Sequence, residues 1–148
     1  MDKVISKDGT PIAWKKAGSG PPLVLVDGAL CYTEAGATPG MLPVLQSHFT
    51  VYVWDRRGRG QSGNTLPWSP QKEIEDLAAI CALCPEPPIV CGFSSGAALT
   101  LYAGAAGLNA RRLVLFEAPF VVVDDSDPKP PVDALQQLQG FIRAGDNK

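Results

Sequence analysis

Four short apolar segments restrict the folds that this chain of 148 residues can adopt. Each is only three to five residues long, rich in β-branched side chains and apolar at consecutive rather than alternating positions. Segments of this kind are typical of strands that are buried on both faces of a parallel sheet. They occupy residues 23–26, 51–54, 89–91 and 112–116.

Helical patterns separate these segments. Ser69 followed by Pro70 marks a helix start, because serine caps helices well and proline is tolerated at the first helical position. Apolar residues then recur at helical spacing until Pro85 ends the pattern. Further helices are predicted at residues 39–47 and 94–106. This alternation predicts an α/β fold with a mostly parallel sheet flanked by helices.

The two ends of the chain differ from this middle part. Residues 3–14 alternate weakly around an Asp-Gly pair at residues 8–9, which predicts a β-hairpin because Asp-Gly suits a tight turn. Towards the other end a polar, proline-rich stretch precedes an amphipathic helix predicted at residues 132–143. We therefore expect a core of residues 1–118 and a second segment of residues 119–148.

Composition and charge exclude several classes of partner. Apolar residues make up 45% of the chain and charged residues 19%, which is typical of a soluble globule. The net charge of −2 gives no overall electrostatic drive towards nucleic acid. The sequence contains no apolar segment of about 18 residues and no secretory signal pattern. We expect a cytoplasmic location, with no nucleic-acid or membrane partner.

The four cysteines admit two interpretations. Cys81 and Cys84 form a C-x-x-C pair, which occurs in redox sites and as half of a zinc site. The pair lies late in a predicted helix, and neither a second pair nor a histidine cluster completes it. This context, and an expected reducing compartment, favour buried structural thiols over chemistry for these two residues and for Cys31 and Cys91.

The motif Gly-Phe-Ser-Ser-Gly at residues 92–96 lies between a predicted strand and a predicted helix. A serine between glycines in that context is typical of a nucleophile elbow, a sharp turn that needs small neighbours. The turn also places Ser94 at a helix N-terminus, where N–H groups stabilise negative charge. The alternative is that the glycines only make a tight turn.

Three further segments accompany this motif in a familiar order. They are Val-Leu-Val-Asp-Gly-Ala at 24–29, Asp-Arg-Arg-Gly-Arg-Gly-Gln-Ser at 55–62, and Leu-Phe-Glu-Ala-Pro at 115–119. Together with residues 92–96, they make the chain resemble the α/β-hydrolase superfamily, in its branch of small bacterial esterase-like and peroxidase-like members. The resemblance covers essentially the whole chain. It implies that residues 119–148 begin the cap, or lid, of that fold.

The resemblance also assigns roles to individual residues. It makes Ser94 the nucleophile, and it makes the backbone N–H groups of Ser95 and Ala29 the oxyanion hole. Asp27 stands where the family most often has histidine, and a carboxylate there weakens anion stabilisation unless it is paired or protonated. Glu117 is a candidate for the triad acid, with a purely structural loop carboxylate as an equal alternative.

The general base is missing from this pattern. A serine hydroxyl needs a base to remove its proton, and in this family a histidine follows the serine and the acid along the chain. The single histidine, His48, precedes Ser94 and lies before a predicted strand, at the opposite end of the sheet. The resemblance therefore implies an N-terminal portion of the fold. A truncated chain, one half of a split hydrolase and a degenerate binding protein all remain open.

These inferences lead to two functional hypotheses. The first is a serine hydrolase that acts on a small ester or related acyl substrate through an acyl-enzyme on Ser94, with no cofactor. Later residues or another chain would then supply the histidine. The alternative is a non-catalytic ligand-binding or interaction protein that keeps the hydrolase scaffold. In either case the incomplete sheet is expected to expose an apolar edge, to be covered by a complementary C-terminal fragment or by a second copy in a homodimer.

Overall fold

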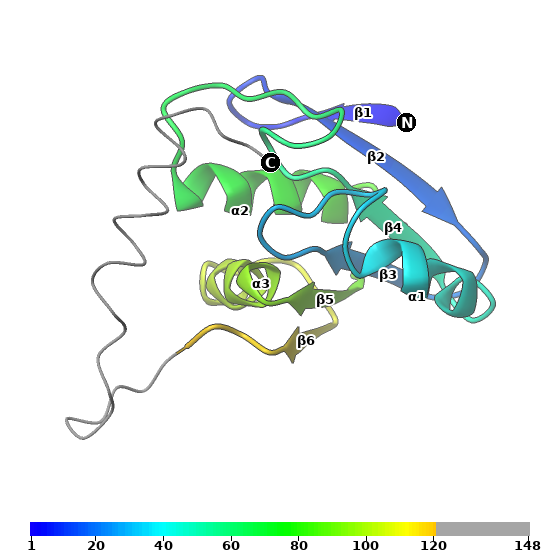
Figure 1. The fold of residues 1–148 in the computed structure, drawn as a ribbon. Helices are drawn as coiled ribbons and strands as arrows, with labels where there is room; N and C mark the ends of the chain where they lie inside the picture. Colours follow the sequence, from blue (N-terminus) through cyan, green and yellow to red (C-terminus); the bar gives the residue numbers. More distant parts are fainter. Residues whose placement is uncertain (121–148) are drawn as a thin grey trace, which may run out of the picture.

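The structure, a computed structural model, describes residues 1–120. The predicted helix at residues 132–143 and nearly all of the predicted cap segment, residues 119–148, lie outside the described residues. The described part is a single sheet with helices on both faces (Figure 1). It contains no helix that is long and apolar enough to cross a membrane.

Six strands form the sheet in the order β1-β2-β4-β3-β5-β6. β1 and β2 are the predicted hairpin and pair antiparallel, and β2 also runs antiparallel to β4. β4, β3, β5 and β6 run parallel to one another, so the mostly parallel sheet is confirmed. The strand bounds are Asp2–Ile5 (β1), Pro11–Ala17 (β2), Pro22–Val26 (β3), Thr50–Trp54 (β4), Ile89–Phe93 (β5) and Arg112–Phe116 (β6).

Three helices connect the parallel strands. α1 spans Thr38–Leu45, α2 spans Pro70–Cys81 and α3 spans Ser95–Ala105, each close to the predicted position. The predicted cap of α2 is present, because the Ser69 side chain accepts a hydrogen bond from the backbone N–H of Lys72 at 3.3 Å. Such a cap contributes about 1 kcal/mol to helix stability.

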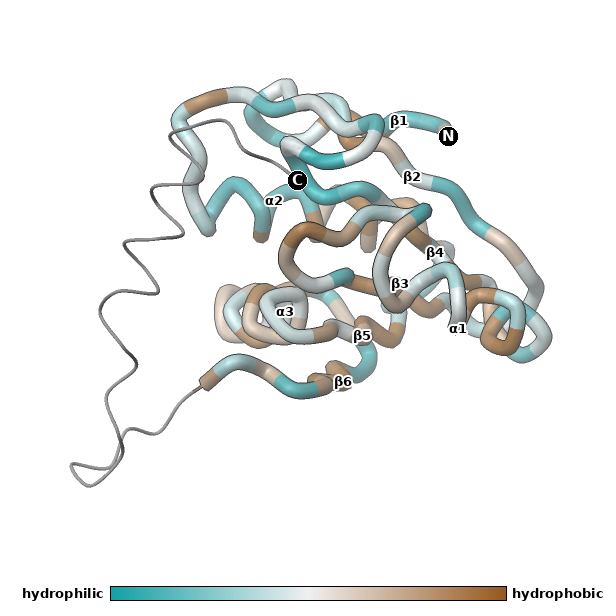
Figure 2. The backbone as a smooth tube through the Cα atoms, in the orientation of Figure 1, coloured by the Kyte–Doolittle hydropathy of each residue, from teal (hydrophilic) through white to brown (hydrophobic). Residues whose placement is uncertain are grey.

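Alternating strand residues form a separate apolar core on each face of the sheet, because successive side chains point to opposite faces. One core contains Leu23, Leu25, Val51 and Val53 and packs against α1. The other contains the intervening strand residues and packs against α2 and α3. Figure 2 shows the resulting apolar centre of the sheet. Burial on both faces is the physical reason that these segments are continuously apolar in sequence.

β6 differs from the prediction of a fourth buried strand. All five of its residues are exposed, and the apolar side chains from Leu113 to Phe116 retain between 37% and 56% of their accessible surface. β6 pairs with β5 on one side only, and residues 1–120 contain no strand beyond it. The expected apolar edge is therefore present at this end of the sheet.

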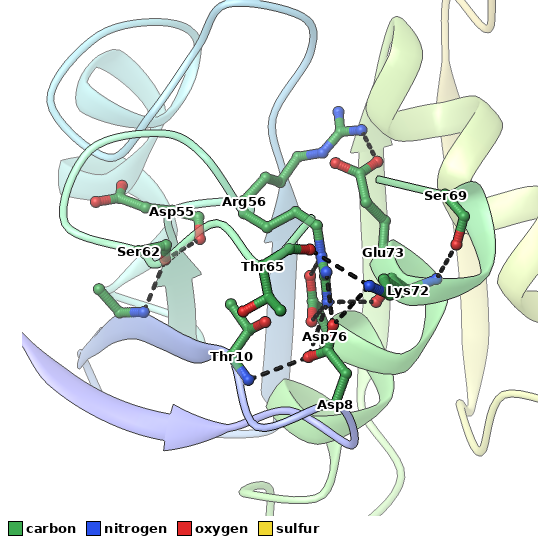
Figure 3. A network of polar contacts seen from close by, with 12 residues as sticks. Asp8, Thr10, Asp55, Arg56, Ser62, Thr65, Ser69, Lys72, Glu73 and Asp76 are labelled. Carbon is green, nitrogen blue, oxygen red and sulfur yellow. Dashed lines mark hydrogen bonds and ion pairs between the residues drawn. The ribbon is translucent and has the colours of Figure 1, made fainter. Parts of the chain in front are cut away.

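A buried ion-pair network joins the loop after β4 to α2 (Figure 3). The guanidinium of Arg57 donates two hydrogen bonds of 2.7 Å to the Asp76 carboxylate, and both side chains are completely buried. It also donates to Asp8 in the β1–β2 turn at 3.0 Å. The Arg57 guanidinium holds the pKa of Asp8 well below its usual range, and the hydrogen bond to Asp76 raises the pKa of Arg57.

Loss of one partner in this network should strongly destabilise the fold. Asp76→Ala leaves the buried Arg57 without its bidentate partner, and we expect a loss of about 3 kcal/mol or more in the free energy of unfolding. The matched control is Lys7→Met, because Lys7 pairs with Glu75 but is 78% exposed, and such surface pairs contribute less than about 1 kcal/mol. Urea unfolding measures both variants; equal effects would contradict the prediction.

Candidate active site

Ser94 occupies a strained turn between β5 and α3. Its backbone φ is +52° and its ψ is −122°, a conformation that non-glycine residues rarely adopt. The side chain is exposed at the carboxyl end of β5, and the backbone N–H of Ser94 donates to the carbonyl of Phe116 at 2.9 Å. The elbow predicted at residues 92–96 has the expected strand-turn-helix context.

Two glycines permit this turn. A Cβ atom on Gly96 would collide with the carbonyl oxygen of Val26 in β3, and one on Gly92 would collide with the carbonyl oxygen of Gly96. Any larger residue at either position would separate α3 from the sheet. The glycines therefore set the close approach that places Ser94 beside the end of β3.

The loop after β3, residues 27–30, lies directly against the elbow. We call it the oxyanion loop, after the role predicted for Ala29. A Cβ atom built on Gly28 would lie 3.3 Å from the Cβ of Ser94 and 3.8 Å from its Oγ. The backbone N–H groups of Ala29 and Ser95 donate no hydrogen bond to any residue within 1–120. The structure thus brings both predicted donors next to the predicted nucleophile and leaves their hydrogens available.

Asp27 is buried and paired with α1. Its Oδ2 accepts a hydrogen bond of 2.5 Å from the Thr38 hydroxyl, while Oδ1 has no partner among the described residues. Burial raises the pKa of Asp27, and the Thr38 hydrogen bond lowers it to a smaller extent. The carboxyl group of Asp27 is therefore partly satisfied by α1, at the base of the oxyanion loop.

Arg56 connects the two halves of the site. Its Nη1 donates to the backbone carbonyl of Asp27 and to the Oγ of Ser95, both at 3.1 Å, and its Nη2 pairs with Glu73 of α2. No sequence motif predicted this role for Arg56. The available signal was its place in the arginine- and glycine-rich loop immediately after β4, whose arginines are usually solvated or paired.

Glu117 lies at the carboxyl ends of the parallel strands, as Ser94 does. Phe93 and Phe116 are register partners, so the next residues, Ser94 and Glu117, follow adjacent strand ends. Glu117 also has a positive φ of +49° and is exposed. It forms no hydrogen bond or ion pair within residues 1–120, so its assignment as the triad acid remains a prediction.

His48 lies at the amino ends of the parallel strands, opposite to Ser94. It follows α1 and precedes β4, whose five residues span about 16 Å. Ser94 lies beyond the other end of the parallel strands, so the imidazole cannot reach its hydroxyl. The predicted separation of the two residues agrees with this geometry.

The expectation of buried structural thiols holds only in part, because Cys81 is buried whereas Cys31, Cys84 and Cys91 are half-buried. All four are free, and Cys81 is buried in the core between the sheet and α2. Burial raises the pKa of Cys81 to about 12 and that of Cys84 to about 11, which disfavours the reactive thiolate. Among the described residues, no group of three or more His, Cys, Asp or Glu side chains could hold a metal ion.

Comparison with protein families identifies the class. The model of the alpha/beta hydrolase family matches residues 18–146, and the chain belongs to this family. An alpha/beta hydrolase from Sphaerobacter thermophilus DSM 20745 is 47% identical and superposes with a TM-score of 0.88. The match covers 98% of this chain and 55% of that protein. The chain therefore spans about half the length of this relative.

Two more distant structures illustrate the range of the fold. An esterase, RhEst1 from Rhodococcus sp. ECU1013, is 26% identical with a TM-score of 0.67, over 76% of this chain and 44% of that one. The bottromycin epimerase BotH is also 26% identical, with a TM-score of 0.74, over 96% of this chain and 56% of that one. The esterase belongs with the hydrolases, whereas the epimerase is named for a different reaction.

The buried Asp27 carboxylate should make stability depend on pH. Its folded-state pKa is raised above the unfolded value of about 4, so the ionised form destabilises the fold at neutral pH. Asp27→Asn should therefore raise the melting temperature at pH 8 by roughly 2–5 °C. The gain should shrink as the pH falls towards the raised pKa of Asp27, because protonation of the wild-type carboxyl group removes the same buried charge.

Thermal unfolding monitored by circular dichroism between pH 5 and 8 measures this difference. Asp2→Asn is the matched control, because it changes the net charge equally at an exposed position of β1. A gain that is constant across the pH range, or equal for both variants, would show that burial of the carboxylate is not its cause.

Proposed function

We propose that this protein is a serine hydrolase that acts on small esters or related acyl compounds. The observation that carries the proposal is the exposed, strained Ser94, flanked by Gly28 and by the N–H groups of Ser95 and Ala29, which have no acceptor within residues 1–120. Strained residues of this kind concentrate at active sites. The nearby Leu30 side chain, 93% exposed, supports an apolar substrate.

In the proposed reaction, the Ser94 Oγ attacks the substrate carbonyl and forms a tetrahedral intermediate. Its oxyanion accepts hydrogen bonds from the Ser95 and Ala29 N–H groups, and the N-terminus of α3 adds a favourable dipole. Collapse of the intermediate expels the alcohol and leaves an acyl-enzyme, which water then hydrolyses. Donors that are fixed in place before reaction stabilise the transition state without reorganisation.

The proposed base lies outside this chain. Ser94 must lose a proton, and the only histidine of the sequence, His48, lies at the opposite edge of the sheet. We propose that a complementary polypeptide segment supplies a histidine and covers the exposed β6 edge. This chain matches only 55% of the Sphaerobacter relative. That length supports a complementary segment, rather than a second copy of this chain, as the partner that covers β6. The four free cysteines support the proposal of a cytoplasmic location.

A fluorophosphonate probe tests the nucleophile. The folded chain should be labelled slowly, because the base is missing, and Ser94→Ala should abolish labelling. Ser47→Ala is the matched control, since Ser47 is an exposed serine at the end of α1. The wild type and Ser47→Ala should also hydrolyse a short-chain p-nitrophenyl ester slowly, and Ser94→Ala should not hydrolyse it. A folded wild-type sample that is labelled no more than Ser94→Ala would rule out the nucleophile.

Added imidazole tests the missing base. A small neutral base can take the Ser94 proton in place of a histidine side chain. The labelling rate should rise several-fold with the concentration of unprotonated imidazole in the wild type, with no change in Ser94→Ala. Fast labelling that does not depend on imidazole would show that this chain already contains a competent base.

Light scattering tests the proposed partner. If a complementary segment covers β6, the isolated chain should have the mass of a monomer, 15.6 kDa, at micromolar concentration. A stable dimer that Val114→Lys dissociates would assign the edge to a second copy instead, because Val114 is 45% exposed on β6.

A non-catalytic binding protein is the second candidate. The distance of His48 from Ser94 favours it, and the bottromycin epimerase shows that proteins of this fold are not all named as hydrolases. This alternative predicts no probe labelling of Ser94 with or without imidazole, in a protein that remains folded.

A further inference from the structure

Two consecutive carbonyl groups of the oxyanion loop accept hydrogen bonds from arginine. The carbonyl of Asp27 accepts from Arg56 Nη1 at 3.1 Å, and the carbonyl of Gly28 accepts from Arg59 Nη1 at 2.7 Å. Both arginines come from the loop after β4. Arginine side chains of the loop after β4 therefore hold two successive peptide groups of the oxyanion loop.

The Gly28 contact bears directly on the predicted oxyanion donor. The carbonyl of Gly28 and the N–H of Ala29 belong to one planar trans peptide, so they point in opposite directions. A donor that holds the carbonyl therefore also sets the direction of the N–H. The positive charge of the guanidinium further polarises the peptide and strengthens its N–H as a donor.

Arg59 has no other described interaction that explains its position. It is half-buried, and burial lowers its pKa. Within residues 1–120 its guanidinium forms no ion pair, and the Gly28 carbonyl is its one acceptor. Arg56 and Arg57, by contrast, are both paired with carboxylates. The partial burial of Arg59 is thus compensated, among the described residues, only by the oxyanion loop.

We propose that Arg59 is a positioning residue for the oxyanion hole, which orients the Gly28–Ala29 peptide so that the Ala29 N–H faces the oxyanion formed on Ser94. This inference rests on the proposed hydrolase function, because only an acyl-transfer reaction forms that oxyanion. Arg59 acts through the peptide and does not touch the reacting atoms.

Three variants test the role of Arg59. Arg59→Met keeps the apolar stem but removes every donor, whereas Arg59→Lys keeps a charged donor that can reach the Gly28 carbonyl. Arg59→Ala provides a second truncation in case the methionine variant does not fold. Arg111→Met is the matched control. Arg111 is an exposed arginine just before β6, at the amino ends of the parallel strands and thus away from Ser94.

The first measurement is the amide ¹H and ¹⁵N resonances of Ala29 in isotopically labelled protein, which needs no catalytic activity. We expect Arg59→Met to change these resonances more than those of other residues. Arg59→Lys should restore them largely, and Arg111→Met should leave them unchanged. A general structural defect would instead spread changes over the sheet.

The second measurement is the rate of fluorophosphonate labelling of Ser94 in the presence of imidazole. Complete loss of an oxyanion donor lowers rates by about 10²–10³-fold, so misalignment in Arg59→Met should slow labelling by at least about 10-fold. The lysine variant should recover most of the rate. The maximal rate should fall, with little change in the probe concentration that gives half of that rate.

The two measurements separate the possible failures. Unchanged Ala29 resonances in a folded truncation variant would overturn the proposal, as would an unchanged labelling rate in a wild type that is labelled. Absence of labelling in the wild type would overturn the hydrolase function itself, and Arg59 would then have no oxyanion to serve.

Discussion

The buried guanidinium of Arg56 is the contact on which the arrangement of the site depends. It pairs with Glu73 of α2 and also donates to the Asp27 carbonyl and the Ser95 hydroxyl. A buried charge is costly unless it is paired, and Glu73 supplies that partner, although the Nε of Arg56 donates to no described residue. One side chain therefore connects α2, the oxyanion loop and the elbow: Glu73 of α2 neutralises its charge, and the Asp27 carbonyl and the Ser95 hydroxyl accept its hydrogen bonds.

The parallel register of the sheet explains why the candidate site forms at the carboxyl ends of β3, β5 and β6. Val26 pairs with Gly92 and Phe93 with Phe116, so the next residues of three strands emerge side by side. All three non-glycine residues with positive φ within residues 1–120, Leu30, Ser94 and Glu117, follow these strand ends. Strained residues of this kind cluster at active sites.

Much of the fold could be predicted because it depends on local sequence patterns. Segments buried on both faces must be apolar at every position, and Ser69 and Pro70 mark the start of α2 by capping chemistry. The elbow was predictable for a similar reason, since only glycine permits the close approach of α3 to β3. The apolar composition of β6 did not distinguish an edge strand from a central one, because both can have the same sequence; the exposed edge was expected instead from the partial resemblance to the hydrolase fold.

By itself, the sequence determined the strand-helix alternation, the hairpin and the position of a strained serine, since each depends on residues close together in the chain. Only the tertiary structure decided which donors surround that serine and what holds them. The contacts of Arg56 and Arg59 with the oxyanion loop join residues about 30 positions apart. The direction of a long, flexible arginine side chain is set by packing and charge across such distances, and no local pattern encodes it.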